Sequence, residues 1–153
     1  MTEITAQHAA AYLNGERELR DLIALDPSYI AQLRGRAQFF LEGGHHDRAL
    51  IMLEMLEEID RTDALPTLLA VEVLLKQGHS DRAEQKILRL LERHPNSAEA
   101  RVAHAELLIQ TGELVAAAAI LEGVIAADPR GRTDAGRRAQ GVAGRAYDLF
   151  ESA

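Results

Sequence analysis

The fold of this chain is indicated by a motif that occurs three times, first as Leu41-Glu42-Gly43-Gly44-His45-His46-Asp47-Arg48-Ala49. The glycines that mark the three copies are spaced 34 residues apart, and they are Gly44, Gly78 and Gly112. A small residue follows each glycine five positions later, and these residues are Ala49, Ala83 and Ala117. A fixed period of this size indicates repeated structural units that stack on one another.

The residue types at these positions indicate two antiparallel helices joined by a short turn. The turn needs a residue without a Cβ clash, which is glycine. The alanine five positions on is predicted to lie where the two helices come closest, because a larger side chain would wedge them apart. Pro95 and Pro129, 17 residues after the second and third glycines, close their units.

A 34-residue unit with these features resembles the tetratricopeptide (TPR) repeat, whose unit is helix, turn, helix. The resemblance implies an all-α, TPR-like α-solenoid in a single domain, 1–153. We expect an N-terminal helical segment over 1–29, repeats over 30–63, 64–97 and 98–131, and a capping helix over 132–153. No strand pattern occurs in the sequence.

Helix boundaries follow from capping residues and glycines. A first helix is expected from about Ala6 to Leu25, with Asn14-Gly15 as the point where it can break. Asp26-Pro27 is predicted to start the next helix, and Ser80 and Ser97 are predicted caps further on. The second helix of the first repeat should run from about His46 to Asp60. Its predicted buried residues are Ala49, Leu50, Leu53, Leu56 and Ile59.

The closing helix is expected from Thr133 to about Ser152, with Ala139 in the packing position. Its Arg137, Arg138 and Arg145 are predicted to face water, and its three glycines should weaken it by about 1 kcal/mol each relative to alanine.

Composition narrows the range of functions. The net charge is -7, which argues against a nucleic-acid partner, because phosphate contacts need clustered Lys and Arg. The chain has no cysteine, and no apolar run approaches the length that crosses a bilayer. The N-terminus lacks a basic segment followed by an apolar one. We therefore expect a cytoplasmic protein with no membrane association.

In the TPR family, five positions of each first helix line the concave face, and the resemblance assigns a partner-binding groove here. The predicted groove residues are Arg34, Gln38, Leu41, Leu65, Leu68, Glu72, Leu75, Val102, Glu106 and Ile109. Apolar side chains that do not serve the core usually serve a partner. The alternative is that some of them pack under a terminal helix. Glu72, Glu99 and Glu106 would repel the acidic peptides that other TPR proteins grip with a carboxylate clamp.

The N-terminal Tyr12-Leu13-Asn14-Gly15 run, three repeats and a closing helix resemble the class II chaperones of bacterial type III secretion systems. The run from Ala105 to Leu114 is similar to that family's third repeat, whereas the aromatics of the family's first repeats are mostly missing. The resemblance implies a cytoplasmic chaperone that holds an apolar segment of a secreted, translocator-like protein. The alternative is a general TPR adaptor that assembles a bacterial protein complex.

The same resemblance implies self-association into a homodimer through the N-terminal segment. The candidate residues are Tyr12, Leu13, Leu19, Leu22 and Ile23. In the alternative, this segment simply covers the first repeat.

Nothing in the sequence predicts an enzyme, a cofactor or a metal site. His45 and His46 are adjacent and cannot easily chelate one ion, and no third ligand lies at helical spacing. No phosphate-binding loop or nucleophile elbow occurs. The sequence therefore predicts a protein-interaction module.

Overall fold

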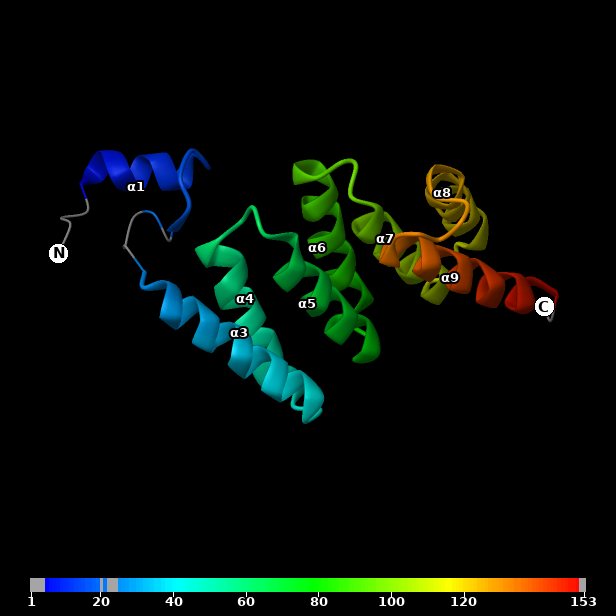
Figure 1. The fold of residues 1–153 in the computed structure, drawn as a ribbon, viewed down its shortest axis with the longest axis horizontal. Coiled ribbons are helices and arrows are strands. Elements are labelled where there is room, and N and C mark those ends of the chain that lie inside the picture. The colour runs from blue at the N-terminus through cyan, green and yellow to red at the C-terminus, as the bar shows by residue number, and fades with distance from the viewer. Residues whose placement is uncertain (1–4, 20, 22–24, 152–153) are drawn as a thin grey trace. The chain divides into compact units, whose positions relative to one another are not determined.

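The computed structural model describes residues 5–19, 21 and 25–151. All regular secondary structure in these residues is helical (Figure 1), so the predicted all-α, TPR-like fold is confirmed. The helices are α1 (Ala6–Leu13), α3 (Pro27–Glu42), α4 (His46–Ile59), α5 (Ala64–Lys76), α6 (Ser80–Arg93), α7 (Ala98–Gln110), α8 (Leu114–Ala127) and α9 (Asp134–Glu151). No described helix is long and apolar enough to cross a membrane.

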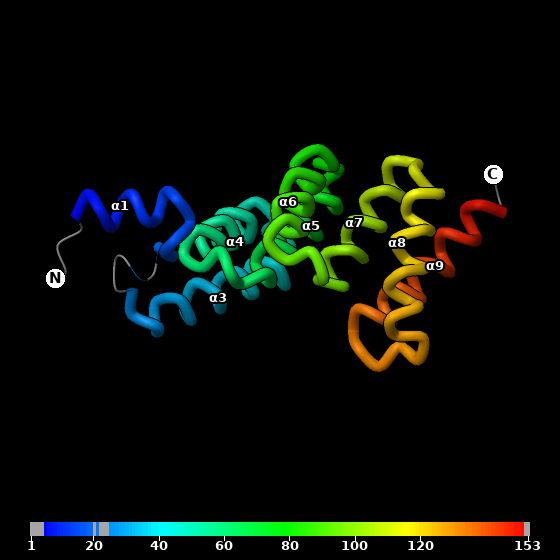
Figure 2. The backbone as a smooth tube through the Cα atoms, turned by 90° about the horizontal axis from the view of Figure 1, so that it is seen from above, coloured from blue at the N-terminus to red at the C-terminus, as the bar shows by residue number. Residues whose placement is uncertain are grey.

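The contacts divide the chain into two compact units, residues 1–73 and 74–153. The first unit contains α1, α3, α4 and most of α5, and α3 packs against α4. In the second unit, α7 packs against α6, α8 and α9, and α8 also packs against α9. The tube in Figure 2 shows the close pairing of α8 with α9.

The turns have the predicted geometry. Gly44, Gly78 and Gly112 have φ values of 71°, 76° and 87°, a left-handed conformation in which a Cβ would be strained. The alanines five residues later are completely buried, and they are Ala49, Ala83 and Ala117. The small residue therefore allows α4 to approach α3, and α8 to approach α7, directly after the turn.

Most predicted helix ends are also confirmed. The Asp26 carboxylate accepts a hydrogen bond from the Ser28 backbone N–H at 2.8 Å, with Pro27 opening α3. Ser97 caps α7 by accepting from the Ala100 N–H at 3.1 Å. In α4 the five predicted core residues, Ala49, Leu50, Leu53, Leu56 and Ile59, are all buried.

Two local predictions were wrong or incomplete. Ser80 does not cap α6: it is the first helical residue, and His79 holds the cap position without a side-chain hydrogen bond. The predicted first helix ends at Leu13, because Asn14 closes α1 and Gly15 has a φ of 74°. The break at Asn14-Gly15 is therefore real. Part of the segment that follows lies outside the described residues.

The junction between α8 and α9 is held by one carboxylate. Asp128 accepts hydrogen bonds from the backbone N–H groups of Arg132 and Thr133 at 3.0 and 2.8 Å, and from the Thr133 hydroxyl at 2.8 Å. The Thr133 Oγ1 in turn accepts from the Gly136 N–H at 3.0 Å. These bonds lower the pKa of Asp128, led by the bond from the Thr133 N–H, because they stabilise its charged form.

Candidate functional site

The first unit contains a small cavity of about 100 Å³ between α3, α4 and the start of α5. Its lining residues come from all three helices, and they are Arg34, Ala37, Gln38, Leu53, Leu56, Leu65, Pro66 and Leu69. Three of them were predicted groove residues, namely Arg34, Gln38 and Leu65. Leu65 is 52% exposed, so an apolar side chain stands at the mouth of an apolar cavity.

Polar groups at this cavity are held by specific bonds. The Arg34 guanidinium donates to the Asp63 carboxylate at 2.7 Å, and the same carboxylate accepts from the Leu65 backbone N–H at 3.0 Å. The Gln38 amide donates to Glu42 at 2.7 Å. Asp63 therefore joins α3 to the first turn of α5 and holds Leu65 beside the cavity.

The remaining predicted groove residues of α3 and α5 do not line this cavity. Leu41, Leu68 and Glu72 are half-buried, whereas Leu75 is buried at 9% exposure. A side chain as covered as Leu75 has little surface left for a partner.

The third repeat differs from the prediction of an open apolar surface. Val102 is fully buried in a core that includes Ala139 and Val142 of α9. Glu106 accepts from Arg138 of α9 at 3.1 and 2.6 Å, and Ile109 is half-buried against the same core. The alternative interpretation, that some groove residues pack beneath a terminal helix, therefore holds for Val102, which lies in one core with residues of the C-terminal helix α9.

All three predicted arginines of α9 are exposed, as expected, but each also contacts other groups of the protein. Arg138 is bonded to α7 and does not only face water, and Arg145 lies 3.8 Å from the Glu106 carboxylate. Arg137 bonds within the α8–α9 junction, to the carbonyls of Gly131 and Arg132.

The N-terminal helix is bonded to the end of α4. The Tyr12 hydroxyl donates to Glu58 at 2.7 Å and accepts from Arg61 at 2.8 Å, while the Arg61 guanidinium lies 4.5 Å from the centre of the Tyr12 ring. The hydrogen bond to Glu58 raises the pKa of Tyr12, and the same carboxylate raises the pKa of Arg61. Glu18 adds a bond to the Arg61 N–H at 2.7 Å.

The predicted self-association residues therefore have different environments. Tyr12 contacts the first repeat, as the alternative interpretation expected. Leu13 is 79% exposed and Leu19 is half-buried. Leu22 and Ile23 lie outside the described residues.

The histidine-rich turn serves a structural contact. The His45 ring meets the Phe40 ring edge-on at 6.2 Å, and no group of three or more His, Cys, Asp or Glu residues that could hold a metal occurs in the part of the chain that the structure describes.

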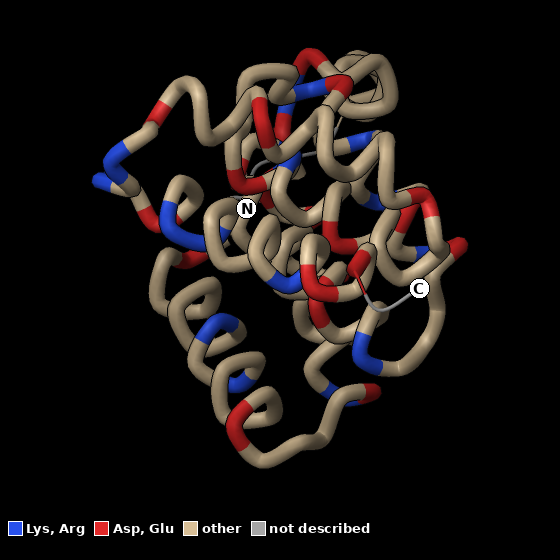
Figure 3. The backbone as a smooth tube through the Cα atoms, turned by 90° about the vertical axis from the view of Figure 1, so that its right-hand side faces the viewer, with Lys and Arg blue, Asp and Glu red and all other residues tan. Residues whose placement is uncertain are grey.

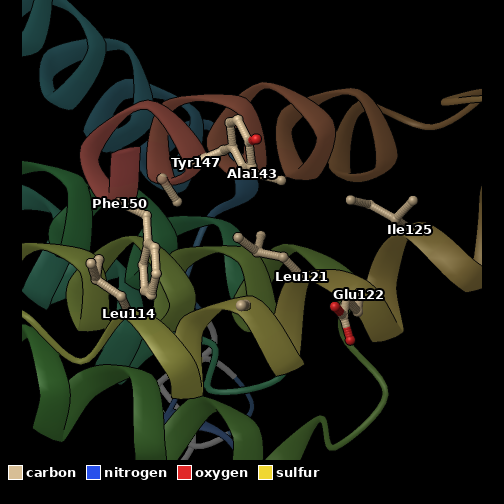
Figure 4. A pocket seen from close by; sticks show the side chains of 9 residues that line it. Leu114, Leu121, Glu122, Ile125, Ala143, Tyr147 and Phe150 are labelled. Carbon is tan, nitrogen blue, oxygen red and sulfur yellow. The ribbon is translucent and has the colours of Figure 1, made fainter. Parts of the chain in front are cut away.

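A larger groove, of about 290 Å³, lies between α8 and α9 of the second unit (Figure 4). None of the predicted site residues lines it. Its signal was present, since Tyr147 and Phe150 are aromatic residues three positions apart on a helix that was predicted to be a solvated cap.

The helices, turns and packing define a TPR-like helical repeat protein. A comparison with family models agrees, because residues 68–132 match the tetratricopeptide repeat. A comparison with curated protein sequences found no match.

Solved structures with the same fold include several from type III secretion. A type III secretion system complex from Aeromonas hydrophila matches with a TM-score of 0.76 at 20% identity, over 95% of this chain and 98% of that chain. The translocator chaperone SycD of Yersinia enterocolitica matches with a TM-score of 0.70 at 19% identity, over 90% and 98%. PcrH, solved with the chaperone binding region of PopD, matches with a TM-score of 0.63 at 21% identity, over 84% and 92%. The predicted fold resemblance to class II chaperones is thus confirmed.

Proposed function

We propose that this chain is a protein-binding module that acts in the cytoplasm as a type III secretion chaperone, with residues 1–153 as one functional domain. In this proposal it holds an apolar segment of a secreted, translocator-like protein. The observation that carries the proposal is the cavity beside Leu65, where an exposed leucine, an apolar lining and a fixed arginine meet. The fold shared with SycD and PcrH supports the choice of partner class.

The geometry supports a specific binding mode. An apolar side chain of the partner enters the cavity and packs against Leu53, Leu56 and Leu69, which removes its surface and that of Leu65 from water. Polar groups of the partner backbone then meet Gln38 and the Arg34–Asp63 pair at the rim. An extended segment loses conformational entropy on binding, so we expect a modest affinity.

We also propose that two chains associate through Leu13. Its side chain is 79% exposed, whereas Tyr12 is bonded to the first repeat and is not available in this structure.

The partner proposal is tested by co-expression with a candidate translocator that is insoluble alone. The chain should bring it into the soluble fraction, and Leu65→Asp should reduce the co-purified partner by about tenfold, a loss of about 1.4 kcal/mol. Ile51→Asp is the matched control, because Ile51 is 55% exposed in the same unit and does not line the cavity.

Equal capture by the wild type, Leu65→Asp and Ile51→Asp would contradict the proposed site. A partner that stays soluble without this chain, yet is still captured through Leu65, would instead indicate the adaptor role.

A further inference from the structure

We propose that the groove between α8 and α9 docks an amphipathic helix of a partner protein, whose apolar face is flanked by Lys and Arg. The groove lies in the second unit and shares no residue with the cavity beside Leu65. This inference therefore does not depend on the proposed translocator site.

The groove occupies the place where the second helix of a fourth unit would pack. Ala139 follows Ala105 by 34 residues, and both are completely buried, so α9 packs like the first helix of a fourth unit. Ala146 stands 34 residues after Gly112, where the preceding unit turns, and α9 continues without a turn to Glu151. The second helix of a fourth unit does not occur within the described residues.

The packing of the second unit shows the consequence. α7 packs against α6, α8 and α9, whereas α9 packs against only α7 and α8 among the described helices of this unit. In a stack of helix pairs, each unit covers the apolar face of its neighbour. A second helix of a fourth unit would pack against both α8 and α9. The groove lies at the position that such a helix would occupy.

The lining is mostly apolar and comes from one face of each of two helices. The residues of α8 are Leu114, Ala118, Leu121, Glu122 and Ile125, and those of α9 are Ala143, Ala146, Tyr147 and Phe150. Both sets follow the spacing of one helix face. Figure 4 shows Phe150 reaching from α9 toward Leu114, with Leu121 between the two helices. Two neighbouring apolar faces of this kind fit a helix that inserts its own apolar stripe.

The groove leaves large apolar side chains in water. Tyr147 is 64% exposed and Phe150 is 65% exposed, although both line the groove. Exposed aromatic residues around a concave apolar surface are typical of a binding site. Their burial contributes a large favourable free energy to the binding of a partner.

Charge selects the occupant. Figure 3 shows acidic and basic residues dispersed along the described backbone. Glu122 is the one charged residue among the described lining residues, and Glu151 accepts a hydrogen bond at 2.8 Å from the hydroxyl of Tyr147, which also lines the groove. The nearby Arg145 approaches Glu106 of α7 at 3.8 Å. A basic helix is attracted to this rim, whereas the same groove of a second copy would place acid against acid.

The test uses a labelled peptide of about 18 residues, about five helical turns, with leucines on one face and lysines on its flanks. We expect saturable binding by fluorescence anisotropy. Ala118→Arg should weaken binding by about tenfold or more, because it fills the groove and repels lysine. The control is Ala119→Arg: Ala119 is also exposed but does not line the groove, and this variant should bind within about twofold of wild type.

Two further measurements keep the test decisive. Phe150→Ala should also weaken binding. It replaces Ala118→Arg as the test variant if the circular dichroism of Ala118→Arg shows that its helices are lost. A peptide with glutamates in place of the lysines should bind about tenfold more weakly than the lysine peptide. Equal affinity for wild type and both groove variants, or for both peptides, would overturn the proposal. So would a wild-type dimer that Ala118→Arg, but not Ala119→Arg, converts to a monomer.

Discussion

Two glycines of α9 that look alike in the sequence have opposite roles. A Cβ on Gly136 would collide with the carboxylate of Asp128, whose side chain holds the start of α9. A Cβ on Gly144 would meet nothing within 4 Å. Gly136 is therefore required by a close approach of α9 to the α8–α9 junction, while Gly144 only weakens the helix.

This difference predicts opposite effects of the same substitution. Gly136→Ala should lower the free energy of unfolding by about 1 to 3 kcal/mol, because Asp128 has to move. Gly144→Ala, its matched control, should raise it by about 1 kcal/mol through helix propensity. Urea unfolding followed by circular dichroism measures both, and a stabilising Gly136→Ala would contradict the close approach.

The Asp128 side chain that limits the residue at position 136 also holds the junction between α8 and α9. Asp128 makes three bonds there, and these lower its pKa below its ordinary value of 3.8. A carboxylate with a depressed pKa in the folded state adds stability above its unfolded pKa, and loses it as the pH falls through the folded value.

The junction should therefore weaken in acid. At neutral pH, Asp128→Asn should be less stable than wild type, because an amide cannot accept all the bonds that the carboxylate accepts. The difference should shrink as the pH falls below about 4 and through the lowered pKa of folded Asp128, where the wild-type carboxylate gains a proton. Asp26 also has a lowered pKa but is present in both proteins, so its effect cancels. Unfolding free energies of the two proteins against pH give the measurement, and a difference that does not change with pH would contradict the role of the charge.

At the scale of the whole molecule, the open question is how many chains act together. Leu13 and Val115 are 79% and 78% exposed, on α1 and α8 respectively, so they form a matched pair of exposed apolar residues. If self-association uses the N-terminal segment, Leu13→Glu should convert a concentration-dependent dimer into a monomer. Val115→Glu should leave the dimer unchanged.

Analytical ultracentrifugation over a range of concentrations measures this. A wild-type chain that is monomeric throughout would remove the self-association proposal, and the N-terminal segment would then have the covering role indicated by the Tyr12 bonds. Tyr12→Phe distinguishes that role, because it should loosen α1 without changing the exposed Leu13.

The sequence was sufficient to predict the turns, most helix boundaries and the small residues between paired helices, although not the end of α1 or the cap of α6. These features depend on local chemistry: Gly112 takes a left-handed conformation, Ser97 caps its own helix, and Ala117 lies five residues beyond its turn. It also predicted three of the residues around the cavity in the first unit, because the repeat frame fixes which face of α3 and α5 they occupy.

Tertiary structure alone decided which of the predicted groove residues are accessible. Val102 and Leu65 are both apolar residues on first helices, yet one is buried under α9 and the other is half exposed beside a cavity. Their exposure depends on which neighbouring helix covers each position, and that neighbour is distant in the sequence. For the same reason, the sequence predicted neither the need for glycine at position 136 nor the groove between α8 and α9. Each depends on contacts between separate elements.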